Sequence, residues 1–153
     1  MISVILIVSK TKNMSRSGPI IIIEDDNDDK QIFENILSEL EVSNTVICFE
    51  NTTAAFDFLL TTDLSPFIIF SDINLPGKTG LDFKKEVDED ETLRKKCIPF
   101  LFYSTSTVQR DVNQAYTEMT VQGFFQKGTE YSEMKAMIKI IIDYWKLCKH
   151  PNT

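Results

Sequence analysis

Apolar residues follow two alternating patterns along this chain. Short continuous apolar runs are separated by segments in which apolar residues recur every three or four positions. The short runs predict five strands, at residues 20–23, 45–49, 67–70, 98–103 and 123–126. The first of these is four consecutive isoleucines, which are apolar on both faces, as expected of a strand in the middle of a parallel sheet.

Helical spacing of apolar residues follows each predicted strand. It predicts five helices, at residues 28–40, 54–60, 80–87, 108–119 and 132–148. The acidic stretch at residues 88–91 leads from the third helix into a further turn. Strictly alternating strands and helices predict an α/β fold: one five-stranded parallel sheet, doubly wound as (βα)5, with helices on both faces and right-handed crossovers.

One domain accounts for most of the chain, which has no internal repeat and no low-complexity linker. We expect it to span residues 18–149, with a C-terminal tail at 150–153 and an N-terminal extension at 1–17. Two interpretations of the extension stay open. Either Met14 is the natural start and residues 1–13 are a mis-called upstream segment, or these residues form an added edge strand or a partner-binding tail.

Composition narrows the class of protein. At 153 residues and 42% hydrophobic, the chain suits one domain with a proper core, and its net charge of −7 argues against a nucleic-acid partner. Cys48, Cys97 and Cys148 form neither a metal pattern nor a disulfide framework, which predicts a reducing, cytoplasmic location. The apolar segment at residues 1–8 is too short to span a bilayer, so no membrane partner is expected.

Polar residues whose side chains can bind a metal ion or take part in a reaction lie at the ends of the predicted strands. Glu24 and Asp25 follow the first strand, Asp72 the third, Ser104 the fourth and Lys127 the fifth. In a parallel sheet of this kind, functional groups gather at the carboxyl ends of the strands. Carboxylates that crowd together there repel one another unless a cation neutralises them. Oxygen ligands supplemented by waters suit Mg²⁺, which is the cofactor that we expect.

This set of groups is suited to a phosphoryl group. A carboxylate can act as a nucleophile and form an acyl phosphate, while a metal ion and a lysine spread the charge of the transferred group. The chain has only five glycines and no glycine-rich phosphate loop. The phosphoryl group is therefore expected to come from another protein or from a small acyl phosphate.

Four stretches, in order and each at a strand end, resemble the response-regulator receiver domain of two-component systems. They are "IIIIEDDNDD", "FIIFSDINLPGKTG", "IPFLFYSTS" and "GFFQKG". The resemblance covers residues 20 to 148, and within the family the chain is similar to the single-domain chemotaxis regulators. The resemblance implies a flavodoxin-like fold. It also implies that Asp72 is the phosphoacceptor.

The same resemblance assigns a metal site. Asp25 and Asp72 match direct ligands of Mg²⁺, the backbone carbonyl of Asn74 completes the site, and Glu24 acts through water. An extra acid, Asp26, departs from the pattern and is expected to alter access to the site. The competing interpretation is that Asp25 and Asp26 simply cap the first helix.

The remaining roles concern the switch. Lys127 matches the family's lysine, Ser104 its switch hydroxyl and Phe124 its aromatic switch position. Gly128 stands where the family usually has proline after the lysine, which leaves the rigidity of that loop open.

The resemblance implies a stand-alone response regulator and not an enzyme, beyond self-catalysed phosphorylation and dephosphorylation. A sensor histidine kinase or phosphotransfer protein would phosphorylate Asp72, and the protein would then switch partner binding or relay the phosphoryl group. The alternatives are a haloacid-dehalogenase-type phosphatase, which would need a second acid where Asn74 stands, and a non-phosphorylated pseudo-receiver that only binds partners.

The last predicted helix is expected to carry a homodimer or partner surface. Met134, Met137, Ile138, Ile141, Trp145 and Cys148 form its apolar core stripe by spacing. Ile140, Ile142 and Tyr144 lie off this stripe, and exposed apolar groups usually mark an interface.

Overall fold

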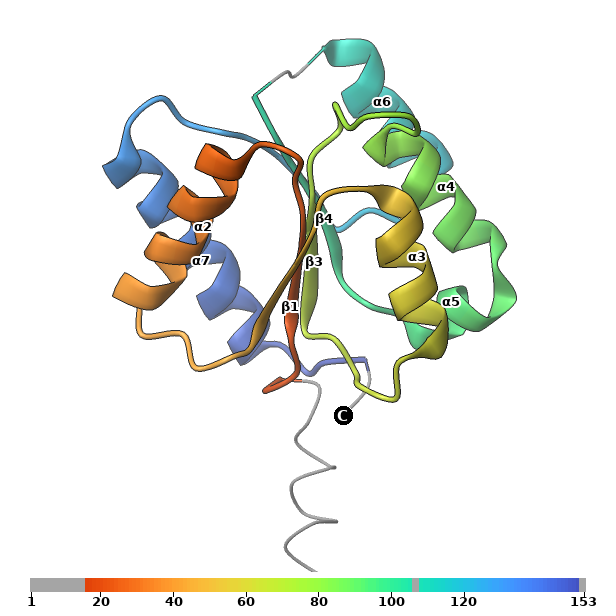
Figure 1. Ribbon diagram of the computed structural model, residues 1–153, viewed down its shortest axis with the longest axis horizontal. Helices are drawn as coiled ribbons and strands as arrows, with labels where there is room; N and C mark the ends of the chain where they lie inside the picture. Colours follow the sequence, from red (N-terminus) through yellow and green to blue (C-terminus); the bar gives the residue numbers. More distant parts are fainter. Residues whose placement is uncertain (1–15, 106–107, 152–153) are drawn as a thin grey trace, which may run out of the picture.

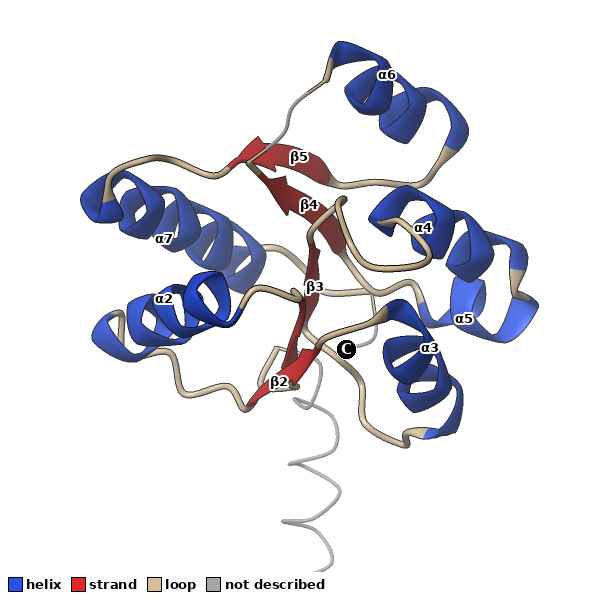
Figure 2. Ribbon diagram, turned by 45° about the horizontal axis from the view of Figure 1, so that its top comes forward, coloured by secondary structure: helices blue, strands red, loops and turns tan. Residues whose placement is uncertain are grey.

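Five parallel strands form one sheet in the order β2-β1-β3-β4-β5 (Figures 1 and 2). The computed structural model describes residues 16–105 and 108–151. The strands are β1 (Ile20–Ile23), β2 (Val46–Phe49), β3 (Ile68–Ser71), β4 (Phe100–Ser104) and β5 (Gly123–Gln126). The predicted α/β class, the single five-stranded parallel sheet and its double winding are confirmed.

Helices cover both faces of this sheet, as Figure 1 shows with the sheet near the centre. On one face lie α2 (Asn27–Glu39) and α7 (Tyr131–Leu147). On the other lie α3 (Thr52–Thr61), α4 (Gly80–Glu89), α5 (Glu91–Lys96) and α6 (Gln109–Glu118).

The isoleucines of β1 divide between the two layers of the core. Ile20 and Ile22 pack with the residues of α2 and α7, whereas Ile21 and Ile23 pack with those of α3 and α4. Successive side chains of a strand point to opposite faces, so four adjacent apolar residues serve both layers. This is why the run is apolar throughout rather than alternating.

The segment that follows the acidic stretch at residues 88–91 differs from its prediction as a turn. Asp88 and Glu89 end α4, and Glu91 begins a six-residue helix, α5, so the described residues contain six helices instead of five. The side chain of Asp90 caps α5 by accepting a bond from the backbone N–H of Leu93, at 2.9 Å. Leu93 is buried in the core, which supplies the apolar contact that such a short helix needs.

One prediction about the exposed face of α7 is wrong. Ile140 and Tyr144 are exposed, at 69% and 60%, but Ile142 is buried at 4%. Ile142 lies four residues after Ile138, which places both on the same face of the helix. Because α7 packs against both the sheet and α2, its buried stripe is wider than the predicted one and includes Ile142.

The two ends of the described chain lie close together near the N-terminal ends of β1 and β3. Lys146 of α7 donates to the carbonyl of Arg16 at 2.8 Å, and His150 is buried with its ring against Phe67. Residues 1–13, on which two interpretations stay open, lie outside the described residues. In the part of the chain that the structure describes, no helix is both long and apolar enough to cross a membrane.

Candidate functional site

Backbone pairing brings the predicted polar residues to one edge of the sheet. The N–H of Asp72 donates to the carbonyl of Ile23 at 3.0 Å, which sets Asp72 beside Glu24. The N–H of Lys127 donates to the carbonyl of Ser104 at 2.8 Å, which holds the end of β5 to the end of β4. The strand order, with β3 next to β1, therefore assembles residues that are far apart in the sequence.

The loop after β3 fixes the Asp72 carboxylate. Its Oδ1 accepts a bond from the backbone N–H of Ile73 at 2.7 Å. The loop returns to start α4 at Gly80, whose N–H donates to the carbonyl of Ile73 at 2.8 Å. A Cβ on Gly80 would lie 2.1 Å from the carbonyl oxygen of Asp72, so only glycine permits this close approach.

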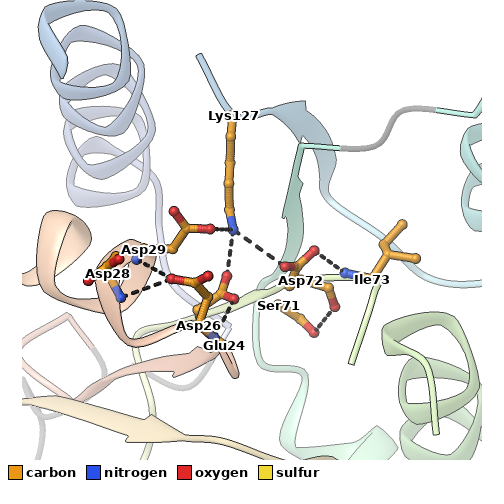
Figure 3. A network of polar contacts seen from close by, with 8 residues as sticks. All are labelled: Glu24, Asp26, Asp28, Asp29, Ser71, Asp72, Ile73 and Lys127. Carbon is orange, nitrogen blue, oxygen red and sulfur yellow. Dashed lines mark hydrogen bonds and ion pairs between the residues drawn. The ribbon is translucent and has the colours of Figure 1, made fainter. Parts of the chain in front are cut away.

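Lys127 is the centre of a buried ion-pair network (Figure 3). Its Nζ lies 2.5 Å from Glu24 Oε2, 3.1 Å from Asp29 Oδ2 and 3.4 Å from Asp72 Oδ2. Glu24, Asp72 and Lys127 are all buried, at 5%, 8% and 8% exposure. Burial of charged groups is tolerated only when they are paired, which explains why these residues contact one another.

Burial and charge shift the pKa values of this network. Burial raises the pKa of Glu24 to about 7, although the ion pair with Lys127 acts in the opposite direction. Burial disfavours the charged form of Lys127, but the carboxylates of Glu24, Asp72 and Asp29 outweigh it and raise the pKa of this lysine. Lys127 therefore stays a cation, in contact with three acidic side chains.

An acidic cluster in this site fits a divalent cation. Glu24, Asp25 and Asp72 each offer a carboxylate oxygen, and these oxygens all lie within 4.8 Å of one another. Asn74 is exposed two residues beyond Asp72. Hard oxygen donors with access to water are the ligands of Mg²⁺ and similar ions, so the residues present fit the expected metal.

Two buried hydroxyl groups lie at the end of β4. Ser104 Oγ and Tyr103 OH are buried and have no hydrogen-bond partner among the described residues. A buried hydroxyl without a partner carries a free-energy penalty that an incoming acceptor would remove. Phe124, on β5, is half-buried, and its ring centroid lies 5.6 Å from that of Phe102. It packs on the layer of α3, α4 and α6, and not on the layer that contains Tyr103.

The structure brings together Glu24, Asp25, Asp72 and Lys127, as the strand-end argument predicted. Asp26 lies beside them but caps α2, because its Oδ1 accepts bonds from the N–H groups of Asp28 and Asp29. The capping interpretation thus applies to Asp26.

The sequence argument missed Asp29 and Tyr103. Asp29 is the fifth acid of the run after β1 and lies in the first turn of α2, where acids are common for reasons unrelated to a site. Tyr103 is the last but one residue of β4, a position that looked like ordinary core. Its ring centroid lies 5.8 Å from Lys127 Nζ.

Comparison with known proteins agrees with this arrangement. The family model for the response regulator receiver domain matches residues 20–139. The chemotaxis protein CheY of Pseudomonas aeruginosa is 30% identical over 131 residues, covering 81% of this chain and 95% of that protein.

Two solved structures share the fold. The phosphorylated cyanobacterial phytochrome response regulator RcpA superposes with a TM-score of 0.77 at 24% identity, covering 88% of this chain and 98% of that one. The Mn²⁺-bound form of response regulator Rcp1 superposes with a TM-score of 0.76 at 23% identity, covering 88% of this chain and 99% of that one.

Proposed function

Because the chain belongs to the response regulator receiver domain family, we propose that it is a stand-alone switch that accepts a phosphoryl group on Asp72. The donor is a sensor histidine kinase or a phosphotransfer protein. The output is a change in partner binding, or transfer of the phosphoryl group to a further protein. Its only chemistry is self-catalysed phosphorylation and dephosphorylation, and we place it in the cytoplasm.

One observation carries this proposal: the Asp72 carboxylate stands between an acidic cluster and a buried lysine. Asp72 Oδ2 lies 3.4 Å from Lys127 Nζ, and the Asp72 carboxylate also belongs to the cluster with Glu24 and Asp25. A nucleophile with a cation on one side and metal-binding oxygens on the other suits phosphoryl transfer, where catalysis is mostly charge stabilisation.

This geometry supports the following transfer step. A carboxylate oxygen of Asp72 attacks the phosphorus, and a new P–O bond forms as the P–N bond of the donor phosphohistidine breaks. The electron pair of the broken bond stays on the imidazole. Lys127 donates a hydrogen bond to an oxygen of the transferred group and balances part of its charge. With a small acyl phosphate, the leaving group is instead a carboxylate.

Asp25, Asp72 and the Asn74 carbonyl would hold Mg²⁺ directly, with Glu24 acting through water. The ion would neutralise charge on the phosphoryl oxygens. The Mn²⁺-bound form of Rcp1, a protein of the same fold, supports a divalent ion.

Phosphoryl labelling tests the proposal directly. We expect the intact mass of the wild-type protein to rise by one phosphoryl group when it is incubated with acetyl phosphate and Mg²⁺. With EDTA in place of Mg²⁺, the increase should be lost, because the charge of the site is then left uncompensated. No increase under either condition would favour the pseudo-receiver interpretation.

Ser104→Ala should separate phosphorylation from its conformational effect. The unpartnered, buried hydroxyl of Ser104 is available to donate a hydrogen bond to a phosphoryl oxygen. Formation of this bond would move Ser104 inward and let Phe124 change its packing. We expect the alanine variant to be labelled but to lose most of the NMR shift changes near Phe124 on addition of beryllofluoride, a phosphoryl mimic. Thr105→Ala, at the exposed next residue, is the control. Equal shift changes in wild type and Ser104→Ala would exclude this coupling.

Helix α7 is the proposed surface for a homodimer or a protein partner. Ile140, Tyr144 and Leu147 are large, exposed and apolar on the outer side of this helix. Ile140→Glu should weaken self-association by tenfold or more in sedimentation, since a buried glutamate in an apolar contact costs more than about 1.4 kcal/mol. Leu64→Glu, at an exposed leucine after α3, should have no such effect. A wild-type protein that is monomeric with and without beryllofluoride would rule out the homodimer.

A further inference from the structure

The ammonium group of Lys127 has no hydrogen-bond donor left for a phosphoryl group. A lysine ammonium carries three N–H donors and no acceptor. Within the described residues its Nζ has three carboxylate partners, Glu24, Asp29 and Asp72 (Figure 3). An oxygen of an incoming phosphoryl group can bond Lys127 only if one of these carboxylates gives up its place.

We propose that Asp29 is the partner that gives up its place, so that it holds Lys127 in the resting protein and competes with the phosphoryl group. This inference rests on the proposed function of Asp72. Asp29 is thus a positioning residue: it acts on the reaction through Lys127.

Burial distinguishes Asp29 from the other two partners. The side chain of Asp29 is 37% exposed, whereas those of Glu24 and Asp72 are 6% and 10% exposed. Water can solvate the Asp29 carboxylate as soon as Lys127 leaves it. Glu24 would be left as a buried carboxylate without its hydrogen bond from Lys127, and Asp72 stays a buried carboxylate until the P–O bond forms, so release of either is more unfavourable.

The position of Asp29 supports this role. It lies in the first turn of α2, where its backbone N–H donates to Asp26 Oδ1 at 3.0 Å. The backbone of Asp29 therefore stays fixed while its carboxylate is free to turn toward water. The helix dipole favours a negative charge there whether or not Lys127 is bound, so release leaves the helix intact.

Asp29→Asn should have opposite effects on the resting and the phosphorylated states. Loss of an ion pair should lower the melting temperature of the protein alone. The affinity for beryllofluoride, measured with Mg²⁺, and the rate of labelling by acetyl phosphate should each rise about fivefold, the factor that corresponds to about 1 kcal/mol. A residue with a merely structural role would weaken both states.

Asp28→Asn is the matched control. It removes the same charge from the same helical turn, but Asp28 is exposed and is not one of the partners of Lys127 among the described residues. We expect no more than a small change in affinity from this variant. Asp29→Glu, which keeps the charge, should stay close to wild type.

Two results would overturn the inference. An equal gain in beryllofluoride affinity in Asp28→Asn and Asp29→Asn would mean that the effect comes from general charge repulsion. A loss of beryllofluoride affinity in Asp29→Asn would mean that Asp29 orients Lys127 toward the phosphoryl group instead of competing with it. Failure of the proposed function itself gives a different result, because wild type would then neither bind beryllofluoride nor be labelled.

Discussion

Asp72→Asn should abolish incorporation of a phosphoryl group, with the labelling rate falling at least 100-fold below wild type. The amide lacks the anionic oxygen that attacks phosphorus, and no proton transfer within the site can restore it. The fold should survive, because asparagine has nearly the same shape and its side-chain oxygen can still accept the bond from the Ile73 N–H. Intact-mass measurement after incubation with acetyl phosphate and Mg²⁺ checks this result.

Asp26→Asn provides a control from the same acidic surroundings. Asp26 caps α2, and asparagine is as good a cap as aspartate, so this variant should be labelled at a rate close to wild type. If Asp72→Asn takes up a phosphoryl group at the wild-type rate, the phosphoacceptor is another residue and the proposed function of Asp72 is wrong.

The strands and the sheet could be predicted because local pattern and global fold agree in this chain. Four isoleucines in β1 serve both core layers, and alternating strands and helices leave few other topologies. The strand-end argument located the cluster for the same reason. Asp72 and Glu24 lie side by side through the pairing of β3 with β1, which follows from the double winding.

The predictions that proved wrong concern features that depend on tertiary contacts. Spacing alone placed Ile142 on the exposed side of α7, but the helix lies in the angle between the sheet and α2 and buries it. Helix α5 was expected to be a turn, because six residues with one buried leucine carry almost no periodic signal.

Asp29 was missed for a related reason. An acid in the first turn of a helix has a sufficient local explanation, and its contact with Lys127 joins residues 98 positions apart. No local pattern encodes such a contact. Only the packing of α2 beside the end of β5 creates it.

Lys127→Ala should lower the free energy of unfolding by about 3 to 5 kcal/mol in EDTA. The substitution leaves the carboxylates of Glu24 and Asp72 buried without a cation. Asp29, at 37% exposure, should contribute little to this loss, because water solvates it. Urea denaturation of both proteins measures the difference.

The loss should be larger at pH 8 than at pH 6. With Lys127 present, burial already raises the pKa of Glu24 to about 7, and removal of the lysine raises this pKa further. A carboxyl group whose pKa is higher in the folded protein than in the unfolded chain favours folding while it is protonated. That contribution is lost as the pH rises through the folded-state pKa, so the variant loses more stability than wild type over this range.

Mg²⁺ should raise the free energy of unfolding of Lys127→Ala by more than it raises that of wild type, because the uncompensated carboxylates bind a divalent cation more strongly.

Lys135→Ala is the matched control. It breaks an exposed ion pair between Lys135 and Glu39, whose charged atoms lie 3.0 Å apart, and it should lower the free energy of unfolding by less than about 1 kcal/mol. A Lys127→Ala protein as stable as wild type in EDTA at pH 8 would contradict the network around Lys127. Equal losses from the two lysine variants would do the same, because burial is what separates the two ion pairs.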